Sequence, residues 1–108
     1  MTARSEYDAA YFTLLRAIEE RDELLRYREW LSAERARLDA FSEATQQATA
    51  GLSRRVTRTV DRTTKPLLEE VGRRRAVVLD ELSRMDDRIA NAERFVEECE
   101  AELAALRR

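Results

Sequence analysis

The chain has 108 residues, of which 39% are charged and 44% are hydrophobic, and it contains only two glycines and one proline. Ordinary globular domains carry about 25% charged residues, and compact folds with strands need many turns built on glycine and proline. This composition excludes a compact α/β or all-β fold and predicts a single helical domain over residues 1–108 made of a few long helices.

The functional groups that the chain lacks narrow its chemistry. Histidine, the commonest general base and metal ligand, is absent. Cys99 is the single cysteine, which excludes an internal disulfide and a multi-cysteine metal site. A catalytic thiol would also need an activating base, which the chain lacks. The longest uninterrupted apolar run has four residues, which is too short for a signal peptide or a membrane span. We therefore expect a soluble cytoplasmic protein that is not an enzyme and holds no metal or cofactor.

The first predicted helix covers residues 5–44. This stretch contains strong helix formers and neither glycine nor proline. Apolar or small residues recur every seven positions, and a second series beside them widens the stripe beyond what a two-stranded seam needs. The first series is Ala10, Ala17, Leu24, Leu31 and Leu38, and the second is Tyr7, Tyr11, Leu14, Ile18, Leu25 and Phe41.

The connector, residues 45–65, has a different composition, with many threonines, two glutamines and Gly51. Gly51 is suited to end the first helix, because glycine readily adopts the left-handed conformation found there. Ser53 is suited to cap a short helix over residues 54–62. The sequence therefore predicts a short connecting helix rather than a structureless loop.

The last predicted helix covers residues 66–106. From Val71 to Leu106 the apolar positions alternate spacings of four and three, which is a coiled-coil seam over five heptads. Arg75 interrupts this seam. It either specifies the register or packs its stem while its head reaches Glu69 or Glu70, and we favour the second because Arg75 lies near the turn.

The start of this helix is predicted from its end-capping residues. Pro66 suits a first turn, where its missing N–H costs nothing, and Thr63 or Thr64 would cap that turn.

The two long segments have similar lengths and are expected to pair antiparallel as a coiled-coil hairpin. Partners whose residue numbers sum to 113 then face each other, such as Ala17 with Val96 and Leu14 with Cys99. Opposite charges repeat every seven residues at nearly the same register. The predicted pairs are Arg21 with Glu93, Arg28 with Asp86 or Asp87, and Arg35 with Asp80.

More apolar residues are present than one hairpin seam can bury. We expect them to form an interface, and the predicted members are Tyr11, Leu15, Ile18, Leu25, Tyr27, Trp30 and Phe95. A homodimer that forms a four-helix bundle is favoured, because closed two-fold dimers are the commonest homo-oligomers. A three-helix monomer with the connector over the strip and a complex with another protein remain alternatives. Tyr27 and Trp30 are either partner anchors or simply buried in the bundle.

Charge is distributed unevenly along the chain. Residues 51–75 contain eight basic and three acidic side chains, whereas both flanking parts are acidic. Arg54, Arg58 and Arg62 share one helical face and are a candidate phosphate-binding site for nucleic acid or a nucleotide. No aromatic residue lies among them for base stacking, so a solvated face, or one that meets an acidic end of another copy, is favoured.

Two further groups of residues carry no predicted chemistry. The acidic set Glu19, Glu20, Asp22 and Glu23 lacks the histidines that helical-bundle metal sites use. Cys99 falls on the predicted seam and is expected to be a small buried hydrophobe.

The sequence therefore predicts a structural or interaction protein, with a nucleic-acid or nucleotide binder and an amphipathic surface-coating protein as the alternatives.

Overall fold

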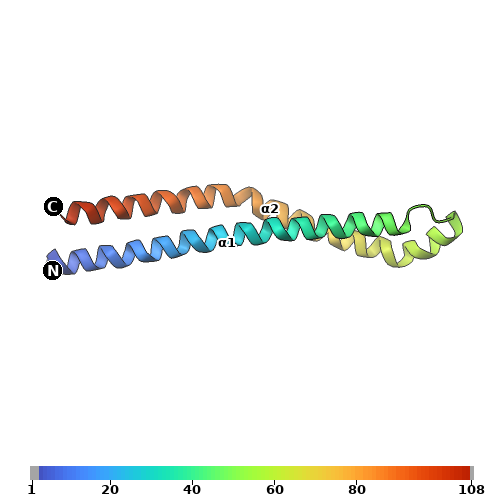
Figure 1. The fold of residues 1–108 in the computed structure, drawn as a ribbon, viewed down its shortest axis with the longest axis horizontal. Helices are drawn as coiled ribbons and strands as arrows, with labels where there is room; N and C mark the ends of the chain where they lie inside the picture. Colours follow the sequence, from blue (N-terminus) through green and yellow to red (C-terminus); the bar gives the residue numbers. More distant parts are fainter. Residues whose placement is uncertain (1–2, 108) are drawn as a thin grey trace. The chain divides into compact units, whose positions relative to one another are not determined.

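The computed structural model describes residues 3–107, and helices are the regular elements of this part of the chain. α1 spans Ala3–Thr49 and α2 spans Arg54–Leu106, with a four-residue turn between them. The two helices fold back on each other as a hairpin (Figure 1). The predicted all-α hairpin is therefore confirmed, whereas the four-helix bundle stays a prediction.

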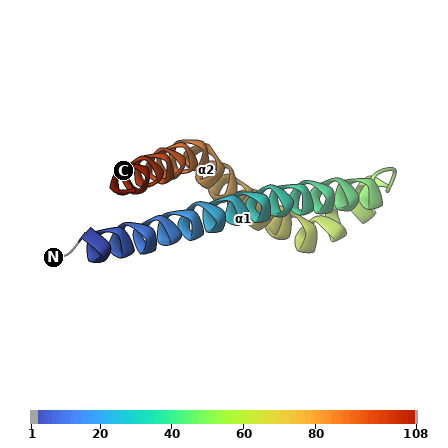
Figure 2. The ribbon, with the colours of Figure 1, turned by 60° about the vertical axis from the view of Figure 1, so that its left-hand side comes forward.

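Two compact units make up the hairpin, and each pairs a segment of α1 with a segment of α2. The first unit contains the described residues up to Glu29 together with those from Arg84 onward, and the second contains Trp30–Ser83. In both units the paired segments run antiparallel and side by side, as two views of the ribbon show (Figures 1 and 2).

The buried core follows the seam predicted on α2. Met85 has no exposed surface, and Ile89 and Val96 are nearly as buried. Burying one such side chain stabilises the fold by roughly 1.5–3 kcal/mol. α1 contributes much less to the core, and its buried apolar residues are Ala17 and Leu31. The two helices therefore differ: α2 concentrates its apolar residues on one face, and α1 spreads them over several.

The predicted antiparallel register is confirmed in the first unit. In the first unit Ala17 packs with Val96 and Cys99, and Leu14 packs against this cluster. Nη1 of Arg28 donates a hydrogen bond to Oδ1 of Asp86 at 3.3 Å, as the charge pattern predicts. In the second unit Arg75 reaches across to α1, where its Nε donates to Oδ1 of Asp39 at 2.5 Å.

Three predicted charge contacts are different in the structure. Arg21 pairs with Asp22 at 3.1 Å instead of Glu93, and Arg35 contacts Asp39 at 3.8 Å. Arg75 binds Asp39 rather than Glu69 or Glu70, and Glu70 instead accepts hydrogen bonds from Arg73.

Two arginines of the predicted charge repeat occupy seam positions, and Arg28 keeps its predicted partner whereas Arg21 does not. Arg21 and Arg28 follow Leu14 at intervals of seven, and both are only half-buried. Their apolar stems pack at the seam while their guanidinium groups extend to carboxylates at its edge.

The turn has the predicted chemistry. Gly51 has a φ of 82°, which L side chains rarely adopt, and it lies just after the end of α1. Ser53 caps α2, because its Oγ accepts a hydrogen bond from the Val56 N–H at 3.4 Å. The Ser53 carbonyl also accepts the Thr57 N–H at 2.8 Å.

The predicted separate connecting helix and the start at Pro66 are wrong. α2 is continuous from Arg54 through Pro66, so residues 54–62 are its first turns. Thr63 and Thr64 do not cap a helix end, because their hydroxyls donate to the Val60 carbonyl at 3.0 and 2.8 Å. Half-buried Thr64 and Leu68 on either side of Pro66 continue the seam, and packing preserves the helix despite the missing N–H.

α1 also ends later than predicted, at Thr49 rather than near residue 44. Ser42, Thr45 and Thr49 are half-buried and extend the seam spacing of three and four with polar residues. Apolar periodicity therefore stops before the helix does.

Candidate functional site

A second stripe on α1 lies beside the seam in the first unit. Tyr11, Leu15, Ile18 and Leu25 are spaced by four, three and seven residues, which places them on one side of the helix. Ile18 packs partly against the core, whereas Tyr11 and Leu15 are 43% and 39% exposed. The stripe thus runs from the edge of the core outward and has the spacing that one helix offers to another.

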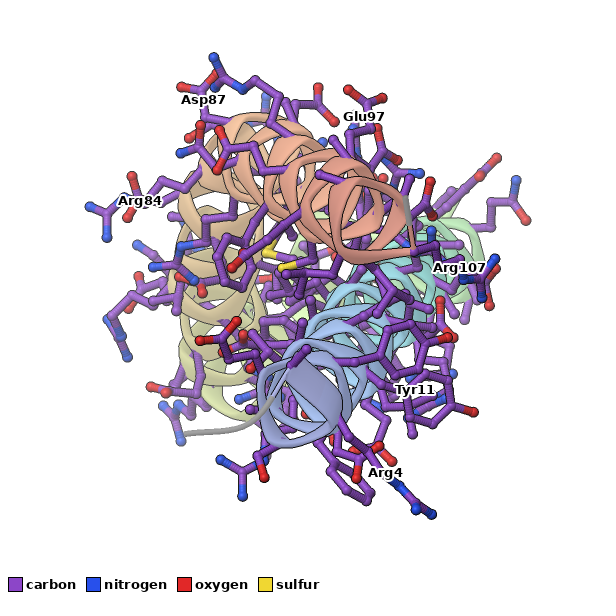
Figure 3. All side chains as sticks on the ribbon, turned by 90° about the vertical axis from the view of Figure 1, so that its left-hand side faces the viewer. Arg4, Tyr11, Arg84, Asp87, Glu97 and Arg107 are labelled. Carbon is purple, nitrogen blue, oxygen red and sulfur yellow. The ribbon has the colours of Figure 1, made fainter. Side chains whose placement is uncertain are left out.

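Tyr11 is the most prominent aromatic residue of this stripe. Viewed along the helices, its side chain points outward from the flank of the first unit rather than into the space between the paired segments (Figure 3). Its ring meets that of Phe12 edge to face, with 6.0 Å between the centroids. Phe12 is 63% exposed and was not predicted to matter, although it ends the apolar run Ala9, Ala10, Tyr11, Phe12.

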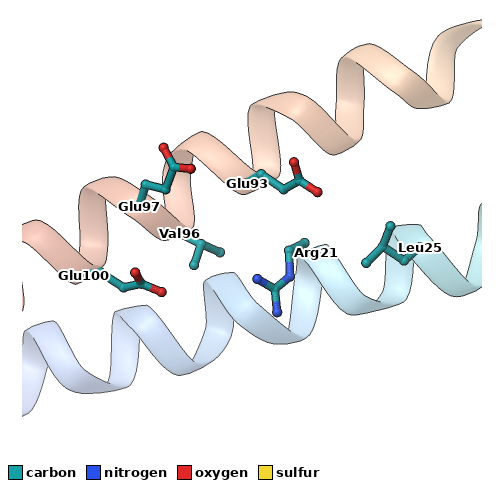
Figure 4. Close-up of a pocket in the computed structure, with 6 residues that line it drawn as sticks. All are labelled: Arg21, Leu25, Glu93, Val96, Glu97 and Glu100. Carbon is teal, nitrogen blue, oxygen red and sulfur yellow. The ribbon is translucent and has the colours of Figure 1, made fainter.

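An open hollow of about 430 Å³ lies where the stripe approaches α2. Arg21 and Leu25 of α1 line one side, and Glu93, Glu97 and Glu100 of α2 line the other with Val96 (Figure 4). Arg21 already pairs with Asp22, so the three glutamates give this flank a net negative charge. Spacings of four and three place them in one row along α2.

The remaining predicted interface residues do not continue this stripe. Tyr27 is 40% exposed but falls off its spacing, and Phe95 is 45% exposed on α2. Trp30 is 46% exposed and belongs to the second unit. They remain candidate contact residues on other parts of the surface.

The predicted phosphate-binding residues form an exposed basic row in the first turns of α2. Arg54, Arg58 and Arg62 are all exposed, and none has an ion-pair partner among residues 3–107. Lys65 differs, because it shares a hollow of about 590 Å³ with Asp61 and Glu69, whose carboxylates oppose anion binding there. The structure thus gathers three unpaired guanidinium groups but adds no built phosphate pocket.

A second group of charges joins the helices within the second unit. Glu34 accepts a hydrogen bond from Arg37 at 2.8 Å and lies 3.9 Å from Arg74 of α2. The hydrogen bond from Arg37, and the charges of Arg37 and Arg74, hold the pKa of Glu34 below its ordinary value. The Glu34–Arg74 and Asp39–Arg75 contacts link α1 to α2 within the second unit.

Cys99 is buried in the core, as predicted, and is 4% exposed. Burial raises the pKa of its thiol, and the negative charges of Glu102 and Glu98 raise it further. The neutral thiol is therefore strongly favoured near neutral pH. Among residues 3–107, no group of three or more histidine, cysteine or acidic side chains is arranged to hold a metal ion.

Comparison of the chain with known protein families, curated proteins and solved structures finds no match. In the part of the chain that the structure describes, no helix combines the length and the apolar character needed to cross a membrane. Functional inference therefore rests on the geometry of the stripe and of the charged rows.

Proposed function

We propose that this chain is a cytoplasmic, non-enzymatic structural or interaction protein that acts through helix–helix association, with a second copy of itself as its first partner. The observation that carries the proposal is the second stripe of α1. Its spacing matches a coiled-coil contact, yet the hairpin leaves Tyr11 and Leu15 about 40% exposed. Large exposed apolar patches on soluble proteins commonly mark association sites.

A second copy fits this stripe because the stripe lies on one helix and is short. A two-fold axis presents the same residues from both copies, so each apolar contact occurs twice. Two α1 segments that pack along their stripes produce a four-helix bundle with the α2 segments outside the new contact. Tyr11 supplies an aromatic anchor whose hydroxyl stays at the solvated edge.

The free energy of association through the stripe follows from the exposed fractions of its side chains. Tyr11 and Leu15 each have about 40% of their surface still to bury, so each contributes roughly 1 kcal/mol per copy on association. Four such contributions amount to about 4 kcal/mol, which corresponds to about a thousandfold change in the dissociation constant.

The test compares two double variants by sedimentation equilibrium at high salt. Tyr11→Ser/Leu15→Ser removes the exposed part of the stripe and is expected to weaken the dimer about a thousandfold. Leu67→Ser/Val77→Ser is the matched control, because it removes two apolar side chains of α2 that are more exposed and lie off the stripe. This control should keep the wild-type mass.

Circular dichroism should show the same helicity in all three proteins, since none of these residues is buried. A wild-type protein that stays monomeric, or a stripe variant that dimerises like the control, would refute self-association through this surface.

A further inference from the structure

Two rows of opposite charge on α2 have no partners within the hairpin. The basic row is Arg54, Arg58 and Arg62, and the acidic row is Glu93, Glu97 and Glu100. All six side chains are exposed, and none forms an ion pair with another of residues 3–107. By contrast, Arg73, Arg74 and Arg75, later on the same helix, each contact a carboxylate.

The two rows match in length and shape. Eight residues separate the ends of the basic row and seven separate those of the acidic row, which are about 12 and 10 Å along a helix. The residues of each row share one face of α2, which is continuous. The row of one copy can therefore lie along the opposite row of another copy without either helix bending.

The acidic row also borders a recess rather than a flat surface. It lines the open hollow with Leu25 and Val96, and Glu97 points away from α1 (Figure 4). Long arginine stems can therefore lie over apolar surface while their guanidinium groups reach the carboxylates.

We propose that the basic row of one copy docks on the acidic row of another, so that copies associate head to tail. Such a contact uses two different surfaces of each copy, so successive copies add head to tail as a chain or close into a ring. This contact is separate from the apolar stripe of α1, and it is set by charge and hence sensitive to salt.

The charge pattern favours a second copy over a nucleic acid as the occupant. No aromatic side chain lies among the three arginines to stack on a base, and the net charge of the chain is −2. Every copy of the chain carries the complementary row, whereas a polyanion would be repelled by the acidic remainder of the protein.

Charge-reversal variants test the proposal by sedimentation velocity in about 10 mM and about 0.5 M NaCl, where the Debye length falls from about 30 Å to a few ångströms. At low salt, wild-type protein is expected to sediment faster with rising concentration than the stripe dimer alone explains, and this additional increase should disappear at high salt. Arg54→Glu/Arg58→Glu/Arg62→Glu and Glu93→Arg/Glu97→Arg/Glu100→Arg should each weaken this association about tenfold or more. An equimolar mixture of the two variants should restore it, because each row then meets a complementary row.

Matched controls separate row contacts from effects of net charge. Arg4→Glu/Arg16→Glu/Arg26→Glu and Glu19→Arg/Glu20→Arg/Glu23→Arg change the net charge equally at exposed positions outside the rows. Both controls should keep the salt-dependent association. The Tyr11→Ser/Leu15→Ser protein should also keep the salt-dependent association. The experiment therefore distinguishes a wrong proposal for the stripe dimer from a wrong proposal for the contact between rows.

Three results would overturn the head-to-tail contact. Wild-type protein could show no association that salt removes, or the mixture of reversed variants could fail to recover it. Alternatively, the basic-row variant could sediment like wild type but lose the retention of a DNA oligonucleotide at low salt, which would assign the row to nucleic acid.

Discussion

A disulfide between α1 and α2 offers a direct chemical test of the register in the first unit. Leu14 packs against the cluster that contains Cys99, so Leu14→Cys places a second thiol beside the only native one. The closed loop has about 85 residues, and its lost chain entropy stabilises the fold by about 4.5 kcal/mol. Replacing half-buried Leu14 by a smaller side chain costs roughly 1–2 kcal/mol, so a net gain of about 3 kcal/mol is expected.

The assay is refolding from urea in a glutathione redox buffer, which gives access to Cys99 before it becomes buried. Peptide mapping without reductant should recover the linked peptides from a single chain, and the urea midpoint should fall on adding reductant. Leu15→Cys is the matched control, because this neighbouring residue is 39% exposed and faces away from Cys99. A Leu14→Cys protein that yields only glutathione adducts or interchain links would refute the antiparallel register.

Three further substitutions test local features of the hairpin, each by urea unfolding. Gly51→Ala should destabilise the protein by about 1–2 kcal/mol, because an L side chain is strained at a φ of 82°. Pro66→Ala should stabilise it by about 2–3 kcal/mol, because the helix interior regains a backbone donor, and an unchanged midpoint would show that α2 does not run through residue 66. The Glu34 pKa is lowered from 4.5 by Arg37 and Arg74, so its stabilisation is present above that value and lost as the pH falls through the folded-state pKa. Glu34→Gln should remove this acid-dependent loss, and an identical pH profile would contradict the assignment.

Much of the fold is predictable because α2 has a regular apolar repeat. Its buried and half-buried residues from Val78 to Leu103 follow alternating spacings of four and three, and their partners on α1 follow from the antiparallel register. Gly51 and Ser53 were also predictable, since the turn needs a positive φ and a cap. Each of these features depends on residues close together in the sequence or on one dominant period.

The features that sequence reasoning missed depend on packing that overrides local preference. Pro66 reads as a helix start, yet tertiary contacts on both sides keep α2 continuous through it. The last turn of α1 carries threonines at seam positions, which an apolar pattern does not reveal. The charge repeat predicted the Arg28–Asp86 contact but not the pairing of Arg21 with Asp22, its neighbour in the sequence.

The candidate site was predicted less completely than the fold. Tyr11, Leu15, Ile18 and Leu25 share one side of α1 because helical spacing fixes this directly. Exposure does not separate Tyr27 and Phe95 from Tyr11 and Leu15, because all four are about equally exposed. They lie off the stripe because Tyr27 departs from its spacing and Phe95 belongs to α2. The acidic row was not singled out, since its significance rests on the absence of ion pairs with the other described residues.

The most direct test of self-association is the solution mass by sedimentation equilibrium in about 0.5 M NaCl, where charged contacts between exposed groups are screened. Self-association through the α1 stripe predicts a mass twice the 12.6 kDa of one chain, which falls toward that of one chain only on dilution or with Tyr11→Ser/Leu15→Ser. A mass of one chain at every concentration would contradict it.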